Sequence, residues 1–85
     1  QGYKSIFVKG VKMTFTVILV EPENPGTIGF MARAMKNFGL TKLILVNPCS
    51  ITPMTRARSM HAWDVVKHAK IVSSFDEAIA GFDEL

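Results

Sequence analysis

The alternation of short apolar runs with turn residues limits the fold of this chain more than any other feature. The runs TFTVILV (14–20) and KLILV (42–46) are rich in β-branched and aliphatic residues, and a proline follows each within two residues. Such near-continuous apolar runs indicate strands that are covered on both faces of a sheet. Between them, residues 27–38 place apolar side chains at helical spacing, which predicts an amphipathic helix.

The rest of the chain continues this alternation. Apolar side chains share one face over residues 55–69, which predicts a second helix, and Ile71 and Val72 indicate a third, short strand. Residues 75–82 predict a brief helix that begins after Ser74 as its cap. Strands and helices in this order are typical of an α/β domain, a parallel sheet with flanking helices and right-handed crossovers.

The two ends of the chain fit this pattern less well. The sequence ends where another strand is expected, so residues 13–85 are predicted to be the N-terminal half of a longer domain. Ile6–Val8 and Val11–Phe15 flank Lys9 and Gly10, and these two segments could form a hairpin. Alternatively, Met13 could be the native start, and we favour residues 1–12 as a peripheral or non-native extension.

Basic residues are concentrated in the middle of the chain. Of the net charge of +3, all comes from lysines in residues 1–12, whereas residues 26–63 hold five basic side chains and no acidic one. Such a block suits a polyanionic partner such as RNA.

Composition also excludes several other classes of protein. A single cysteine, Cys49, excludes an internal disulfide and is typical of a reducing cytoplasm. No apolar run is long enough for a membrane span. One cysteine and two histidines without matched carboxylates do not indicate a metal site.

The loop that follows the first strand is the candidate site, because α/β sheets bind ligands at the carboxyl ends of their strands. It reads EPENPGTIG (21–29) and opens the first helix, with Thr27 as the predicted N-cap and Gly39 as the left-handed residue that closes the helix. Free amides at a helix start favour an anion such as phosphate, whereas the spacing matches neither GxGxxG nor a P-loop. Arg33 could reach back over the helix start to a phosphate or hydroxyl, although an isolated arginine is more often only solvated.

The run EPENPGTIGFMARAMKNFGLTKLILVNP (21–48) resembles the opening of the SpoU-type RNA ribose 2′-O-methyltransferases of the SPOUT superfamily, above all the TrmJ-like tRNA methyltransferases. ARSMHAWDVVKHA (57–69) is similar to their next helix, and the resemblance covers residues 13–85. The first motif of this family, N-x-G-x-x-x-R, falls on Thr27, Gly29 and Arg33, with threonine in place of asparagine.

The resemblance implies methyl transfer from S-adenosylmethionine to a ribose 2′-hydroxyl of RNA, with tRNA as the expected substrate. It implies that Arg33 is the catalytic residue, which orients the hydroxyl or helps to deprotonate it. Further residues are expected to face the RNA: Glu23, Asn24, Gly26, Thr27, Gly29, Arg56 and Arg58. For Arg56 and Arg58, a solvated helix start is an equal alternative.

The family binds its cofactor, and forms much of its dimer interface, in a later segment that makes a trefoil knot. The resemblance therefore implies a homodimer for the complete protein, and its expected location is the cytoplasm, which the single cysteine favours. It also implies no cofactor-binding residue within these 85 residues, and no activity from them alone.

Two other interpretations stay open. The chain could be a non-catalytic fragment that binds RNA or phosphate, or a structural α/β fragment whose sheet edge pairs with another chain. Phe30 and Trp63 could stack on a base, but packing is the more frequent role of such aromatic residues.

Overall fold

A four-stranded sheet forms the centre of the computed structural model, which describes residues 3–11 and 14–80. Within these residues, the strands lie side by side in the order in which they occur in the sequence. Strands β2, β3 and β4 are parallel, and β1 pairs antiparallel with β2. The strands are β1 (Ser5–Val11), β2 (Thr14–Val20), β3 (Lys42–Val46) and β4 (Lys70–Val72).

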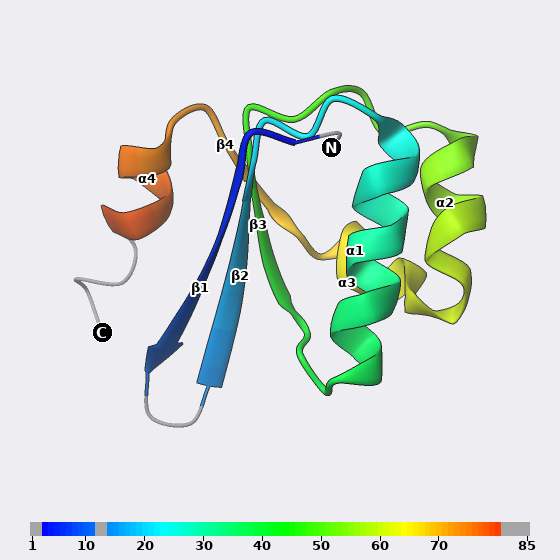
Figure 1. Ribbon diagram of the computed structural model, residues 1–85, viewed down its shortest axis with the longest axis horizontal. Coiled ribbons are helices and arrows are strands. Elements are labelled where there is room, and N and C mark those ends of the chain that lie inside the picture. Colours follow the sequence, from blue (N-terminus) through cyan, green and yellow to red (C-terminus); the bar gives the residue numbers. More distant parts are fainter. Residues whose placement is uncertain (1–2, 12–13, 81–85) are drawn as a thin grey trace.

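Helices cover both faces of this sheet, as Figure 1 shows. Helices α1, α2 and α3 lie on one side and α4 lies on the other. Their bounds are α1 (Pro25–Asn37), α2 (Pro53–Ser59), α3 (Trp63–Lys67) and α4 (Phe75–Ala80), with a short 3-10 helix, η1 (Met60–Ala62), between α2 and α3. This is the predicted α/β class, with a mostly parallel sheet and flanking helices.

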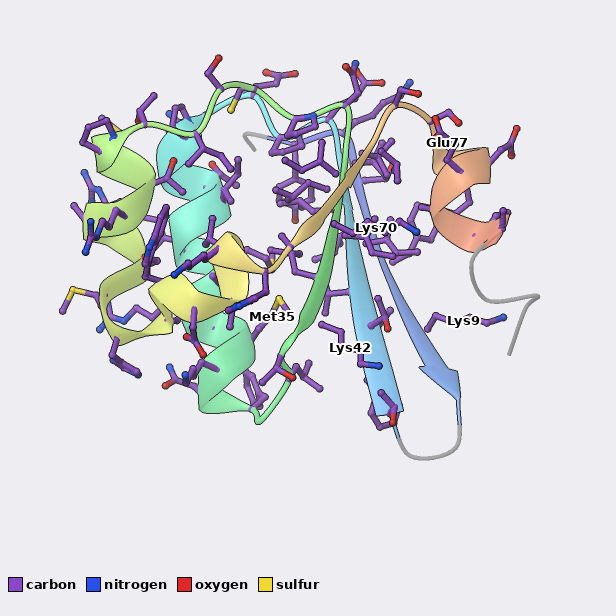
Figure 2. The ribbon with its side chains drawn as sticks, turned by 180° about the vertical axis from the view of Figure 1, so that it is seen from behind. Lys9, Met35, Lys42, Lys70 and Glu77 are labelled. Carbon is purple, nitrogen blue, oxygen red and sulfur yellow. The ribbon has the colours of Figure 1, made fainter. Side chains whose placement is uncertain are left out.

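Alternate side chains of the two central strands form two apolar layers. Val17 and Leu19 of β2, with Leu43 and Leu45 of β3, pack against α1 and α3. The residues that point the other way include Ile18 of β2, and they pack against α4. Both central strands are thus covered on both faces, which explains why their apolar runs show no polar alternation. Met35 of α1 points toward the sheet (Figure 2) and belongs to the first layer.

The first helix ends as predicted. Gly39 follows it with a φ of 77°, in the left-handed region that favours glycine. The N–H of Gly39 donates to the carbonyl of Lys36, and the N–H of Leu40 donates to the carbonyl of Met35. These two bonds are the Schellman arrangement, which satisfies carbonyls that the helix end would leave without partners.

The prediction of one continuous helix over residues 55–69 is wrong. The helix breaks at Met60, where φ is 55°, and the chain continues through η1 into α3. Thr55 and Ser59 of α2 are buried near α1, whereas Val65 and Val66 of α3 belong to the layer on the sheet. A residue with a positive φ cannot continue a right-handed helix, so the segment changes direction between these two pairs of buried residues.

The N-terminal segment forms an edge strand. Its pairing runs from Ser5 opposite Val20 to Val11 opposite Thr14, so a hairpin does form, but the predicted pairing of Ile6–Val8 with Val11–Phe15 is wrong. The turn predicted at Lys9 and Gly10 is wrong, because both residues lie within β1. Residues 12–13, and the end of the predicted 75–82 helix, lie outside the described residues. The native or foreign origin of residues 1–12 stays a prediction.

An ion pair joins the end of α1 to the start of α3. The ammonium of Lys36 donates to Asp64 Oδ1 at 2.9 Å and to Oδ2 at 2.8 Å. This hydrogen bond from Lys36 holds the pKa of Asp64 below its ordinary value of 3.8. The stability that the pair contributes is therefore present above that value, and it is lost as the pH falls through the lowered pKa.

We expect Asp64→Asn to melt at a lower temperature than the unaltered chain at pH 7. The difference should be small, because the pair is solvent-exposed. It should disappear when the pH is well below 3.8, because the carboxylate is then protonated. Thermal melts across a pH series measure it, with Glu23→Gln as an exposed acidic control. A difference that persists unchanged in acid would show that Asp64 acts through something other than its charge.

Candidate functional site

The loop after β2 leads directly into the first turn of α1. Asn24 caps this helix: its Oδ1 accepts a hydrogen bond of 2.7 Å from the N–H of Gly26, and its carbonyl accepts from the N–H of Thr27. The prediction of Thr27 as the N-cap is therefore wrong. Pro25 explains the earlier start, because its fixed φ and missing N–H suit the first position of a helix. Thr27 lies inside the first turn.

Removing this cap should weaken the helix start. We expect Asn24→Ala to lose about 1 kcal/mol of unfolding free energy, equivalent to roughly 4–8 °C in melting temperature for a domain of this size. Asn24→Ser retains an oxygen that can accept from the Gly26 amide and should melt close to the unaltered chain. Equal melting temperatures for the alanine and serine variants would mean that the Asn24 side chain does not cap the helix.

Gly29 allows α2 to lie against the start of α1, and Gly26 faces the same helix with more room. A Cβ built on Gly29 would lie 2.5 Å from the carbonyl oxygen of Thr55 and 2.7 Å from Cβ of Arg58. At Gly26, the nearest atoms would be side-chain ends, among them the Sδ of Met54 at 3.4 Å. The close approach at Gly29 holds Arg58 beside the candidate loop.

A hollow of about 270 Å³ lies between these two helices, at the start of α1. Its lining residues are Asn24, Gly26, Thr27, Phe30, Met54 and Arg58. The guanidinium carbon of Arg58 lies 5.3 Å from the centroid of the Phe30 ring. Four predicted site residues thus come together here, with an arginine and an aromatic ring at one wall.

Phe30 and Met54 also line this hollow, although the sequence did not predict them as site residues. Phe30 was expected to pack, and methionines were expected to fill core or interface space. Their spacing carries a weak signal: Met54 lies four residues before Arg58, and Phe30 four residues after Gly26, so each pair shares one helix face.

The other predicted site residues do not line the hollow. Glu23 is exposed in the loop, and Gly29 is buried against α2. Arg56 lies apart, with its guanidinium carbon 5.6 Å from the centroid of the Trp63 ring, and Trp63 packs against the core.

Arg33 is exposed one turn beyond Phe30, about 4.5 Å further along the helix axis. Among the described residues it has no hydrogen-bond or ion-pair partner. Helix geometry tilts each Cα–Cβ bond toward the N-terminus, so the Arg33 side chain leaves the helix in the direction of the hollow. Its guanidinium is thus available to a ligand that extends from the hollow along α1.

The central basic block does not form one surface. Arg33, Arg56 and Arg58 lie on α1 and α2, on one side of the sheet. Lys42 projects on the α4 side, where Lys70 also lies (Figure 2). Lys36 is engaged with Asp64. Arg33 and Arg58 are therefore the cations that the fold leaves nearest to the start of α1.

A larger hollow, of about 660 Å³, lies at the carboxyl ends of β3 and β4. None of the predicted site residues lines it. Among the described residues, no group of three or more His, Cys, Asp or Glu side chains could hold a metal ion. In the same part of the chain, no helix has both the length and the apolar character needed to cross a membrane.

Comparison with known proteins connects this geometry to one family. The profile of the SpoU rRNA Methylase family matches residues 14–85. The chain is 49% identical over 67 residues to tRNA (cytidine/uridine-2′-O-)-methyltransferase TrmJ of Photorhabdus laumondii. It is 48% identical over 63 residues to an uncharacterized tRNA/rRNA methyltransferase of Haemophilus influenzae. These matches cover 76% and 74% of the chain but only 27% and 26% of the relatives, so the chain spans about a quarter of their length.

Solved structures of similar fold also carry methylase or methyltransferase in their names. A probable methylase family protein from Haemophilus influenzae Rd KW20 superposes with a TM-score of 0.71 at 48% identity, over 73% of this chain and 26% of that one. A probable methyltransferase from Bordetella pertussis Tohama I also has a TM-score of 0.71, at 34% identity, over 74% of this chain and 39% of that one.

Proposed function

This chain belongs to the SpoU rRNA methylase family, and from that membership we propose that it forms the RNA-facing part of a tRNA ribose 2′-O-methyltransferase. The relatives named TrmJ carry that activity in their names, and residues 14–85 match the family. The observation that carries the proposal is the hollow at the start of α1. It brings Arg58 of α2 beside the first turn of α1, and Arg33 lies one helical turn beyond Phe30, which is at its wall.

These groups suit a ribose and its flanking phosphates. The planar guanidinium of Arg58 would bind a phosphate, because it can donate to two anionic oxygens at once. The amides of Gly26 and Thr27 already donate to Asn24, so the helix start would contribute only its dipole. Arg33 would then lie beside the ribose, where a fixed cation stabilises the negative charge that develops on the 2′-oxygen as it loses its proton. Holding phosphate and ribose together also orients the hydroxyl for attack. Thr27, in place of the family asparagine, offers a hydroxyl to the same hollow but no amide donor.

The methyl donor of the proposed reaction is S-adenosylmethionine, which supplies an electrophilic methyl group when bound. The hollow at α1 does not fit it: 270 Å³ is below the usual range for ligands of that size, and an arginine at its wall would repel the sulfonium cation. The roles proposed for the residues of this hollow therefore concern RNA. The homodimer, the cytoplasmic location and the inactivity of the chain alone stay predictions.

A chimera tests the proposal. Residues 14–80 would replace the matching segment of the Photorhabdus laumondii relative, which is 49% identical in this region. We expect the chimera to transfer labelled methyl groups from S-adenosylmethionine to ribose 2′-oxygens of tRNA. The same relative without this segment should transfer none.

The outcomes separate the proposal from its alternatives. A folded chimera that binds tRNA but transfers no methyl group would overturn the enzyme assignment in favour of non-catalytic RNA binding. A folded chimera that neither binds nor methylates tRNA would favour the structural fragment.

A further inference from the structure

The exposed ring of Phe30 and the guanidinium of Arg58 form a paired surface at the wall of the hollow. We propose that this pair, the Phe30–Arg58 platform, stacks an unpaired nucleobase of the RNA substrate. The inference rests on the proposed RNA function and deepens it: it assigns a base-binding subsite in addition to the ribose and phosphate contacts. The platform would favour a nucleotide in a single-stranded loop, because only an unstacked base has a free face.

The exposure of Phe30 is the first observation behind the platform. Phe30 leaves 51% of its surface accessible, although it lies on a helix whose opposite face is fully buried. Its ring is not isolated: it lines the hollow and lies against a guanidinium. Bases stack on aromatic rings and on arginine planes, so both halves of the pair can receive the same ligand.

The second observation is that the backbone fixes where the Arg58 side chain leaves α2, close to α1. The absence of a side chain at Gly29 brings Cβ of Arg58 close to α1. Helix α2 begins in a capping box, in which Thr52 Oγ1 accepts from the Met54 amide and Thr55 Oγ1 accepts from the Thr52 amide. Thr55 and Ser59, on either side of Arg58, are completely buried. A preorganised pair loses little conformational entropy when it binds.

Two other aromatic residues of the chain lack this arrangement. Trp63 also lies near an arginine, Arg56, but it packs against the core and lines none of the hollows described above. Phe38, at the end of α1, is 81% exposed but has no guanidinium over its ring among the described contacts. Phe38 therefore serves as a matched control for Phe30.

Two probes of equal charge test the platform with this chain: a short oligoadenylate, and an abasic ribose-phosphate oligomer of the same length. We expect Phe30→Leu to weaken oligoadenylate binding about tenfold, the effect of losing one base–aromatic stack. Binding of the abasic oligomer should not change. Phe30→Trp should restore oligoadenylate binding, and Phe38→Leu should affect neither probe. Arg58→Lys, which keeps the charge but loses the plane, should weaken oligoadenylate more than the abasic oligomer.

Three results would overturn the platform. Equal weakening of both probes by Phe30→Leu would show that the ring supports the fold or the phosphate contacts. Unchanged binding of both probes would leave Phe30 without a role in binding. An unaltered chain that binds neither probe would overturn the platform together with RNA binding by this chain.

The chimera separates the platform from the proposed function. If neither Phe30→Leu nor Arg58→Lys changed the rate of methyl transfer, the proposed base stacking would be wrong, whereas the proposed methyltransferase function would stand. Thermal melts of each variant identify effects that come from unfolding, and the Arg58→Lys comparison tests the platform without changing Phe30.

Discussion

Replacing Arg33 by alanine is expected to reduce methyl transfer by the chimera about a hundredfold to a thousandfold, which is the usual effect of removing one charge-stabilising donor from an active site. The loss should appear in kcat, because the cation acts on charge that develops on the 2′-oxygen only as the reaction proceeds. Affinity for tRNA should change little. Arg33 is exposed and has no hydrogen bond or ion pair in the described part of the chain, so the melting temperature should not change.

The control for Arg33→Ala is Lys67→Ala, which removes an exposed cation from α3. This variant should retain methyl transfer. Arg33→Lys should give an intermediate rate, because an ammonium retains the charge but cannot contact two oxygens in the plane of a guanidinium. If a folded Arg33→Ala chimera transferred methyl groups at a rate close to that of the unaltered chimera, Arg33 would have no role in catalysis.

Gly29→Ala is expected to cause the largest loss of stability. The new Cβ would lie 2.5 Å from the carbonyl oxygen of Thr55, and backbone cannot move aside as a side-chain end can. Overpacking of this kind costs up to about 3 kcal/mol. At the upper end, that equals a fall of roughly 12–24 °C in melting temperature for a domain of this size.

Gly26→Ala is the matched control on the same helix. Its Cβ would meet only side chains, with Asn24 Oδ1 at 3.1 Å as the nearest atom. We expect a change of less than about 1 kcal/mol, because these atoms can shift and alanine favours the helix. Thermal melts of both variants measure the difference. If the two alanine variants had equal stability, α2 would not be held against α1 at Gly29.

Local patterning predicted most of the fold. The two apolar runs became β2 and β3 with the expected bounds, and Gly39 closes the first helix. These predictions depend on neighbouring residues alone: side chains that alternate between two covered faces, and a glycine that can adopt a positive φ.

The predicted site was less complete. The loop, the glycines and Arg58 were identified, but the N-cap was placed on Thr27 instead of Asn24. The helix over residues 55–69 was not expected to break. The break lies at Met60, whose φ of 55° cannot continue an α-helix. The spacing of apolar residues does not reveal the backbone angle of one residue, because it averages over the segment.

The sequence by itself determined the α/β class, the three parallel strands, the loop that opens α1 and the family, because each depends on short-range order or on a contiguous motif. Only the tertiary structure decided which basic side chains share a surface. The fold divides the central basic block and places Lys42 on the α4 side of the sheet. It also brings Arg58 next to Phe30, because α2 approaches α1 so closely at Gly29 that no larger residue fits there. Contacts between α1 and α2 join residues nearly thirty positions apart, and only close packing determines their distance.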